Sequence, residues 1–194
     1  MAYINDTTNV MIVGVGGQGT LLASKLLGEV VRHQGFDVKV SEVHGMSQRG
    51  GSVVTYVRYG SKVSSPIIEL GEADCIIAFE EMEAARYLPY LKKDGLLIVG
   101  TQVIDPMPVI IGAAKAPQGL LDELAGHPIR LVARDALTMA EEAGSAKAVN
   151  LVLMGFYAAR SAFGLDVWED AIRRTVPEKF LEMNLMAFRS AAMA

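Results

Sequence analysis

The sequence has one cysteine, three histidines and no long apolar run, and each shortage argues against a class of protein. Cys75 cannot form an intrachain disulfide by itself, and a single thiol cannot hold an iron–sulfur cluster, which needs about four thiolates. His33, His44 and His127 are scattered along the chain, so we predict no metal site. No apolar run approaches the roughly 18–20 residues that span a bilayer, and residues 1–9 lack the basic and apolar regions of a signal peptide. We therefore expect a cytoplasmic protein that does not bind a membrane.

The charge is close to balanced and gives no indication of a nucleic-acid partner. The 18 basic and 22 acidic side chains give a formal net charge of −4 at pH 7. Hydrophobic residues make up 51% and charged residues 21% of the chain, a composition typical of a globular protein with a well-buried core. Neither an internal repeat nor a low-complexity linker divides the 194 residues. We therefore predict one domain over residues 1–194.

Apolar runs alternate with helical periods along the first two thirds of the chain, as expected of an α/β protein. Residues 10–13 (VMIV) are typical of a strand buried on both faces, and the four-residue spacing of Leu22, Leu26 and Val30 predicts a helix over residues 17–33. Further strands are predicted over residues 36–41, 52–59, 74–79, 96–100 and 129–133, with a short returning strand that begins at Val63. Further helices are predicted over residues 80–93, 119–125, 136–143, 146–163, 167–175 and 177–193. The fold class we predict is α/β, with a Rossmann-like, mostly parallel sheet, flanking helices and a helical C-terminal third.

A glycine-rich turn joins the first predicted strand to the first predicted helix. Its residues Gly14, Gly16, Gly17, Gln18 and Gly19 have the spacing G-x-G-G-Q-G. This spacing, followed by an acid at the end of the second strand (Glu42), matches the fingerprint of a dinucleotide-binding loop, in which a phosphate faces the first N–H groups of a helix. The same glycines also allow a strand and a helix simply to pack closely. The turn alone therefore leaves phosphate binding and close packing as open alternatives.

A second polar segment follows the second predicted strand and should lie at the same edge of the sheet. Its candidate site residues are His44, Ser47, Gln48, Arg49, Gly50 and Gly51. Arg49 has the planar donor geometry that binds a phosphate or carboxylate, although a surface ion pair is an alternative. Ser47 and Ser52 are further possible donors to the same anion. His44 is a weak candidate for an acid–base group, and an ordinary loop histidine is the simpler interpretation.

Other polar residues have simpler explanations. Cys75 lies in a predicted strand and is interpreted as a small core residue. Glu80 and Glu81 are at the same edge as the glycine turn, but carboxylates are also favoured at the start of a helix. Asn150 lies in an apolar helix and is interpreted as a packing or interface group. The chain shows neither a Ser–Tyr–Lys pattern nor a His paired with an Asp, so we predict no complete active site for hydride transfer.

The two polar segments together resemble a known family. The segments VGVGGQG and SEVHGMSQRGGSV, followed by DCIIAFE, DGLLIVGTQVIDP and AVNLVLMG, are similar to the small subunit of 2-oxoacid:ferredoxin oxidoreductases. The resemblance is strongest to the beta subunit of the indolepyruvate type, and extends to the gamma subunit or domain of the pyruvate and 2-ketoisovalerate types. By motif it covers residues 9 to about 155. The glycine turn and the S-Q-R-G-G segment are far more specific as a pair than either is alone.

The resemblance implies a function that this chain cannot perform by itself. In the family, the holoenzyme decarboxylates a 2-oxoacid on thiamine diphosphate, passes electrons through iron–sulfur clusters to ferredoxin and transfers the acyl group to coenzyme A. A large partner subunit holds thiamine diphosphate, magnesium and the clusters, and the chain has no G-D-G…N thiamine–magnesium motif of its own. The chain is then expected to bind no cofactor alone, to be inactive alone, and to help form the approach for coenzyme A and an arylpyruvate-type substrate.

The resemblance assigns this role to residues 14–19 and 44–51 as segments, without individual contacts. It further implies that an isolated small subunit exposes surface that the large subunit normally covers, and can self-associate through it. Two alternatives remain open from the sequence. One is a self-sufficient NAD(P)- or FAD-dependent Rossmann oxidoreductase that uses Glu42. The other is a small-molecule-binding regulatory module.

Overall fold

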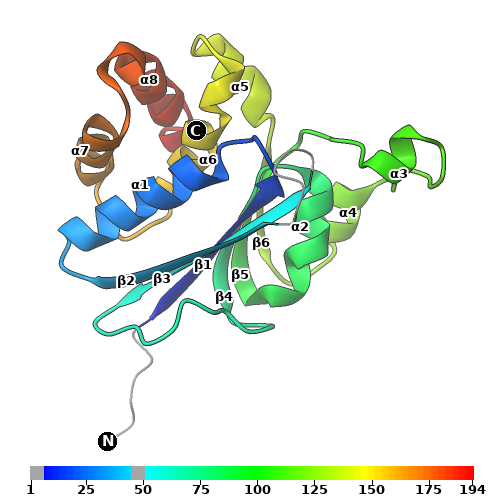
Figure 1. The fold of residues 1–194 in the computed structure, drawn as a ribbon, viewed down its shortest axis with the longest axis horizontal. Coiled ribbons are helices and arrows are strands. Elements are labelled where there is room, and N and C mark those ends of the chain that lie inside the picture. The colour runs from blue at the N-terminus through cyan, green and yellow to red at the C-terminus, as the bar shows by residue number, and fades with distance from the viewer. Residues whose placement is uncertain (1–6, 45–50) are drawn as a thin grey trace, which may run out of the picture.

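A computed structural model describes residues 7–44 and 51–194, and its centre is a six-stranded mixed sheet (Figure 1). The strands are β1 (Thr8–Val15), β2 (Asp37–His44), β3 (Ser52–Gly60), β4 (Ala73–Ala78), β5 (Leu91–Gly100) and β6 (Arg130–Arg134). Their order across the sheet is β2-β3-β1-β4-β5-β6. β1 pairs in parallel with β4, β4 with β5 and β5 with β6, whereas β3 is antiparallel to both β1 and β2. The predicted fold class, a mostly parallel sheet with flanking helices, is confirmed.

The position of β3 departs from a plain Rossmann order, in which the first two strands are neighbours. β3 lies between β1 and β2, with Val57 opposite Val10 on one side and Val40 on the other. Its sequence explains this position, because Val53 and Val54 are both buried although they point to opposite faces of the sheet. The less apolar β2 forms the edge of the sheet. The short strand expected to begin at Val63 is absent from the described residues. The Val63 N–H instead donates to Asp37 Oδ2 at 2.9 Å.

Helices cover both faces of the sheet (Figure 1). One face is covered by α1 (Thr20–His33), α5 (Ala136–Glu142), α6 (Val149–Ala158), α7 (Leu165–Thr175) and α8 (Leu181–Ala192). The other face carries α2 (Glu81–Tyr87) and α4 (Leu120–Ala125). Short turns of 3₁₀ helix occur at η1 (Leu88–Tyr90), η2 (Ala146–Ala148) and η3 (Glu178–Phe180). The helical C-terminal third is confirmed, and no helix among the described residues is long and apolar enough to cross a membrane.

Two of the predicted helices are shorter than expected. The helix expected over residues 80–93 ends at Tyr87, because Pro89 has no backbone N–H with which to continue it. β5 then begins at Leu91, which pairs with Ala73, and Asp94 bulges from this strand instead of forming a turn before it. The helix expected over residues 146–163 begins as η2 and ends as α6 at Ala158.

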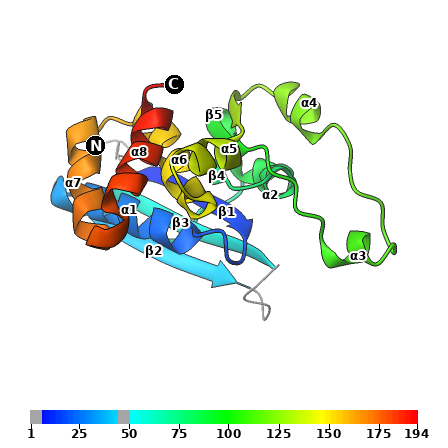
Figure 2. The same ribbon diagram turned by 90° about the horizontal axis from the view of Figure 1, so that it is seen from above.

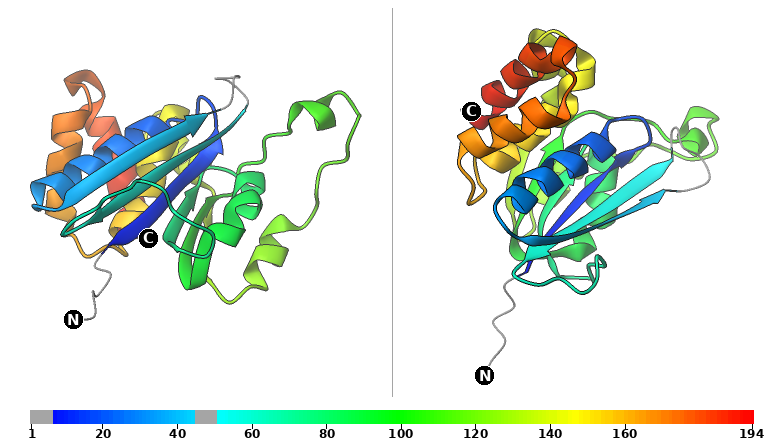
Figure 3. Two further views of the ribbon diagram at one scale, coloured as in Figure 1. Left: turned by 60° about the horizontal axis from the view of Figure 1, so that its bottom comes forward. Right: turned by 60° about the vertical axis from the view of Figure 1, so that its left-hand side comes forward.

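The segment from residue 101 to residue 119 extends away from the sheet (Figures 2 and 3). It carries the short helix α3 (Met107–Ile110). Met107, Ile110 and Ile111 are large apolar side chains on this segment, and each is more than 60% exposed. The segment therefore presents apolar surface that the rest of the chain does not cover.

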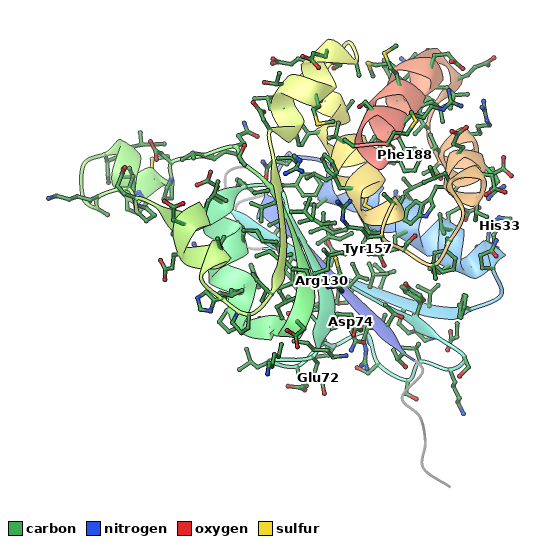
Figure 4. The ribbon with its side chains drawn as sticks, turned by 180° about the vertical axis from the view of Figure 1, so that it is seen from behind. His33, Glu72, Asp74, Arg130, Tyr157 and Phe188 are labelled. Atoms are coloured by element: carbon green, nitrogen blue, oxygen red, sulfur yellow. The ribbon has the colours of Figure 1, made fainter. Side chains whose placement is uncertain are left out.

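The larger core lies under the C-terminal helices. All ten residues of α6 are buried, so this helix occupies the centre of the helical layer. The Trp168 ring of α7 stacks on Phe188 of α8 with centroids 6.2 Å apart and meets Tyr157 of α6 edge to face at 5.8 Å. The Tyr157 and Tyr59 hydroxyls are 3.2 Å apart, which joins α6 to β3 (Tyr157 and Phe188 are labelled in Figure 4). The C-terminal helices are thus part of the same core as the sheet.

An ion pair between α7 and α8 gives this layer a predicted pH dependence. Arg189 Nε donates to Glu169 Oε1 at 2.7 Å, and this hydrogen bond lowers the pKa of Glu169 below its usual value of 4.5. Because the pKa of Glu169 is lower in the folded chain, the unfolded chain binds more protons than the folded one just below pH 4.5. The ion pair therefore stabilises the fold above that pH. This stabilisation is lost as the pH falls through the pKa of Glu169 in the folded chain. Glu169→Gln should lower the free energy of unfolding at pH 7 by on the order of 0.5 kcal/mol, since both side chains are partly solvated.

Urea unfolding of both chains at pH 7 and at pH 3 measures this effect. The difference between the wild type and Glu169→Gln should shrink toward zero at pH 3. Asp170→Asn, on the same helix, is the matched control because Asp170 forms no ion pair within the part of the chain described. A difference between wild type and Glu169→Gln that is equal at the two pH values would rule out this role for the pair.

Candidate functional site

The glycine turn between β1 and α1 has a backbone that requires glycine at several positions. Gly17 and Gly19 have φ angles of +104° and +92°, in the left-handed region that side chains disfavour. At Gly14 the restriction is one of space, because a Cβ there would lie 2.8 Å from Gln18 Oε1 and 3.0 Å from the Cβ of Phe79. The turn is therefore fixed both by its backbone angles and by what packs against it.

Gln18 holds this turn in place by bonding to three strand ends. Its Oε1 accepts the Val15 N–H at 2.7 Å, across the turn itself. Its Nε2 points to the Phe79 carbonyl at 3.4 Å and to Gln102 Oε1 at 3.5 Å, which follow β4 and β5. These long contacts are weaker than the first. Gln18 thus connects the ends of β1, β4 and β5, and both atoms of its amide make contacts within the protein.

The turn leaves backbone N–H groups available at the start of α1. Those of Gly17, Gly19, Thr20 and Leu21 have no hydrogen-bond acceptor in residues 7–44 and 51–194. Together they form the partly positive N-terminus of a 14-residue helix. The Gly16 N–H differs, because it donates to the Gly51 carbonyl at 2.9 Å.

Two pockets flank the turn, and they differ in charge. The first has a volume of about 370 Å³ and lies between the turn, Val53 of β3 and the Glu42 carboxylate of β2. The second, of about 380 Å³, lies between the turn, Gln102 and Lys147 of η2. A carboxylate repels an anion and an ammonium group attracts one. The second pocket is therefore the better of the two for a negatively charged group.

Glu42 does not reproduce the acid of a dinucleotide-binding loop. β2, which carries it, is separated from β1 by the whole of β3, whereas a Rossmann unit places the second strand beside the first. Adjacent strands are about 4.8 Å apart, so Glu42 is displaced by roughly one strand width from the expected position. Glu42 itself is exposed and faces the first pocket.

The second polar segment is described only at its ends. β2 ends at His44, which is paired in register with Val53, and the Gly51 carbonyl accepts from the glycine turn. Both ends of the segment thus lie at the carboxyl end of β1, as the sequence predicted. Ser47, Gln48, Arg49 and Gly50 lie outside the described residues. Their part in a site stays a prediction.

Ser52 is a correction, because its hydroxyl is already used within the protein. It donates to the Glu83 carboxylate on α2 instead of being available to an anion. Glu83 is almost completely buried and also receives the Arg86 Nε–H at 2.9 Å. The sequence did not single out Glu83, because its position one turn into a helix looks like that of any solvated acid.

Glu80 and Glu81 lie at the start of α2, as expected, but they differ in burial. Glu80 is the N-cap and accepts from the Met82 N–H at 3.0 Å and from the Glu83 N–H. Its side chain is buried, and this burial raises the pKa of the carboxyl above its usual value. Burial also raises the pKa of Glu81. The helix-start explanation accounts for Glu80 without a role in a site.

Cys75 and Asn150 both prove to be packing residues. Cys75 is buried in the larger core, and this burial raises the pKa of the thiol far above the physiological range. Asn150, at the start of α6, is buried against the glycine turn; a Cβ on Gly19 would lie 2.9 Å from Asn150 Nδ2. The close contact explains why an amide occurs in this apolar helix.

Lys147 and Gln102, also near the turn, gave no signal in the sequence, because only the tertiary fold brings them there.

The described residues show no group of three or more His, Cys, Asp and Glu side chains arranged to hold a metal ion. They also show no nucleophile hydrogen-bonded to a histidine. Within residues 7–44 and 51–194, this edge of the sheet offers a tightly fixed turn, N–H groups without an acceptor and the cation of Lys147. Such a surface can bind and orient an anionic group, but in the described part it lacks side chains arranged to break or form bonds.

Comparison with known proteins gives one consistent family. The model of the family described as pyruvate ferredoxin/flavodoxin oxidoreductase matches residues 9–194. The indolepyruvate oxidoreductase subunit IorB of Thermococcus kodakarensis is 40% identical over 193 residues, which cover 96% of this chain and 95% of that protein.

Two solved structures have the same fold. The gamma subunit of a keto/oxoacid ferredoxin oxidoreductase from Geobacter sulfurreducens superposes with a TM-score of 0.71 at 23% identity, over 96% of this chain and 99% of that one. The 2-oxoglutarate:ferredoxin oxidoreductase of Magnetococcus marinus gives a TM-score of 0.73 at 15% identity, over 97% of this chain but 31% of that one. In the second protein, the fold is one part of a longer chain.

Proposed function

Because the chain belongs to the pyruvate ferredoxin/flavodoxin oxidoreductase family, we propose that it is the small subunit of a 2-oxoacid:ferredoxin oxidoreductase of the indolepyruvate type. The observation that carries this proposal is the 40% identity to an indolepyruvate oxidoreductase subunit over nearly the full length of both chains. A large partner subunit carries thiamine diphosphate, magnesium and the iron–sulfur clusters, and supplies decarboxylation and electron transfer to ferredoxin. The described part of this chain has one buried thiol and no metal-ligand cluster, so these groups do not fit here.

The glycine turn is proposed to orient the approach of coenzyme A to the large subunit. Free N–H groups at the start of α1 and the ammonium group of Lys147 favour a phosphate at the second pocket. Among the solved structures of this fold, the Magnetococcus marinus enzyme was determined with coenzyme A bound. The residues we assign to this approach or to the partner surface are Gly14, Gly16, Gly17, Gln18, Gly19, His44, Ser47, Gln48, Arg49, Gly50 and Gly51.

The comparisons favour this function over a self-sufficient dinucleotide enzyme. The displaced Glu42 removes the contact that a dinucleotide ribose would need, and the Gln18 Oε1 is already bonded to the Val15 N–H. Titration of the isolated chain with NAD, NADP and FAD in a calorimeter should show no saturable heat. Tight binding of any one of them would favour the alternative.

Assembly with the large subunit tests the proposal and the part that Arg49 plays in it. Mixed with the large subunit, the chain should elute with it as one complex in size-exclusion chromatography. Arg49→Ala should leave the isolated chain folded but weaken the complex, or its apparent affinity for coenzyme A, by about tenfold, as expected for one charge-assisted contact of roughly 1.4 kcal/mol. Arg173→Ala, on the surface of α7, is the matched control and should behave as the wild type. Unchanged assembly and unchanged affinity in Arg49→Ala would remove Arg49 from the site.

A further inference from the structure

An apolar pocket of about 440 Å³ lies on the helical side of the molecule and shares only Lys147 with the second pocket beside the glycine turn. Its walls come from four places in the chain: Leu22 of α1, residues 144–147 between α5 and α6, Val176 and Pro177 after α7, and residues 180–184 from the end of η3 into α8. Its volume is within the range of about 300–1,000 Å³ that small-molecule sites occupy. A mostly apolar lining with a few polar groups is also typical of such sites.

One cation lines this pocket. Lys147 of η2 borders it and forms no ion pair within 4 Å among the residues that the structure describes. A second ammonium group is close, because Lys179 Nζ lies 4.7 Å from the centroid of the Phe180 ring. The lining of the pocket includes the cation of Lys147 and no Asp or Glu, which favours a ligand with an apolar body and a single negative group.

One hydrogen-bond acceptor also lines the pocket. Asn184 of α8 is only 7% exposed. Its Nδ2 donates to the Phe180 carbonyl at 2.8 Å. With the amide in this orientation, its Oδ1 receives no hydrogen bond from the described residues. Asn184 Oδ1 is not among the buried side-chain atoms that lack a partner in the described residues, so solvent reaches it. A ligand that brings an N–H or O–H group into the pocket can take the place of that water.

We propose that this pocket binds a small aromatic carboxylic acid whose ring carries an N–H or O–H donor. The ring lies among Leu22, Val176 and Met183, its donor bonds to Asn184 Oδ1, and the carboxylate pairs with Lys147 at the mouth. The ring is preferred to an aliphatic chain because Phe180 offers a flat apolar surface, 46% exposed, beside the pocket. The site shares Lys147 with the pocket proposed above for a phosphate, but none of its other lining residues belongs to the glycine turn. Its ligand can therefore be tested on the isolated chain, without the large subunit or coenzyme A.

Methyl NMR of the full chain with labelled methionine tests the site, using indole-3-acetate as the probe. The Met183 methyl should shift and saturate, whereas the methyl of Met11, which is fully buried in the core on the opposite face of the sheet, should not move. Tryptamine replaces the carboxylate by an ammonium group, and 1-methylindole-3-acetate lacks the ring N–H. Both should bind at least several-fold more weakly than indole-3-acetate.

Two variants identify the cation. Lys147→Met keeps the apolar stem and removes the charge, so it should weaken indole-3-acetate by roughly tenfold, and the wild-type affinity should fall as salt is added. Lys62→Met, an exposed lysine before β4, is the matched control and should leave binding unchanged. The proposal is overturned if Met183 shows no saturable shift in a folded wild-type chain, if tryptamine binds as well as indole-3-acetate, or if the two lysine variants behave alike.

Discussion

Gly155→Ala should lower the free energy of unfolding by about 2–3 kcal/mol and the Tm by roughly 4–12 °C. Gly155 is the point at which α6 meets α8, and a Cβ there falls on backbone atoms. The added Cβ would be closer to the Phe188 carbonyl oxygen than Cβ atoms in real proteins come to any non-bonded atom. It would also lie 2.9 Å from the Cβ of Ala191. Backbone cannot move aside as a side chain can, so the two helices must separate and open the core around Trp168.

The matched control is the same chemical change in open space. Gly28 lies in the middle of α1, and a Cβ there would meet nothing within 4 Å. Gly28→Ala should therefore raise stability, by about 0.5–1 kcal/mol, because alanine loses less backbone freedom in a helix. Denaturant unfolding of the two variants gives the comparison. Equal effects of the same sign would show that α6 and α8 do not meet at Gly155 in the way the structure has them.

Gln18→Leu should disable the glycine turn while leaving the rest of the fold intact. The leucine has nearly the same size but cannot accept the Val15 N–H or reach the Phe79 carbonyl by a hydrogen bond. Leaving the partly buried Val15 N–H without an acceptor should cost about 1–3 kcal/mol of stability. If the turn orients coenzyme A as proposed, the assembled enzyme should in addition lose at least about tenfold in kcat/KM for coenzyme A, or roughly 1.4 kcal/mol.

Urea unfolding of the chain and steady-state kinetics of the assembled enzyme are the two measurements. Gln34→Leu makes the same replacement on the exposed end of α1 and should change stability by less than about 0.5 kcal/mol, with no change in kinetics. A Gln18→Leu chain as stable and as active in the complex as the wild type would contradict the role given to this side chain.

Much of the fold could be predicted from local pattern, and what could not be predicted depends on pairing over long distances. The apolar run of β1, the four-residue period of α1 and the turn between them are each visible within some twenty residues. The insertion of β3 between β1 and β2 is not, because any β-branched strand can pair with either neighbour. The choice depends on register partners such as Val10 and Val57, which are far apart in sequence.

The candidate site shows the same division. The glycines of the turn were found from their spacing, since a left-handed φ at Gly17 and Gly19 leaves a direct trace in the sequence. The contacts that Gln18 makes could not be predicted from the sequence, because its partners Phe79 and Gln102 lie 61 and 84 residues away. The expected role of Ser52 was wrong for a similar reason, since Glu83, the acceptor of its hydroxyl, belongs to another element.

The extended apolar segment around α3 is consistent with a chain that works beside a partner. Large exposed apolar groups such as those of Met107 and Ile110 are unusual on a protein that acts alone. Together with N–H groups at the start of α1 that can orient an anion, they support the proposed accessory role.

Reconstitution of activity tests that role most directly. The purified chain, the purified large subunit and an equimolar mixture are each given indolepyruvate, coenzyme A and an oxidised viologen dye, and dye reduction is followed by absorbance. The isolated chain should reduce no dye and the mixture should reduce it rapidly, with formation of the acyl-coenzyme A product. Dye reduction by the chain alone, or full activity of the large subunit without it, would contradict the proposal that this protein is the small subunit of the enzyme.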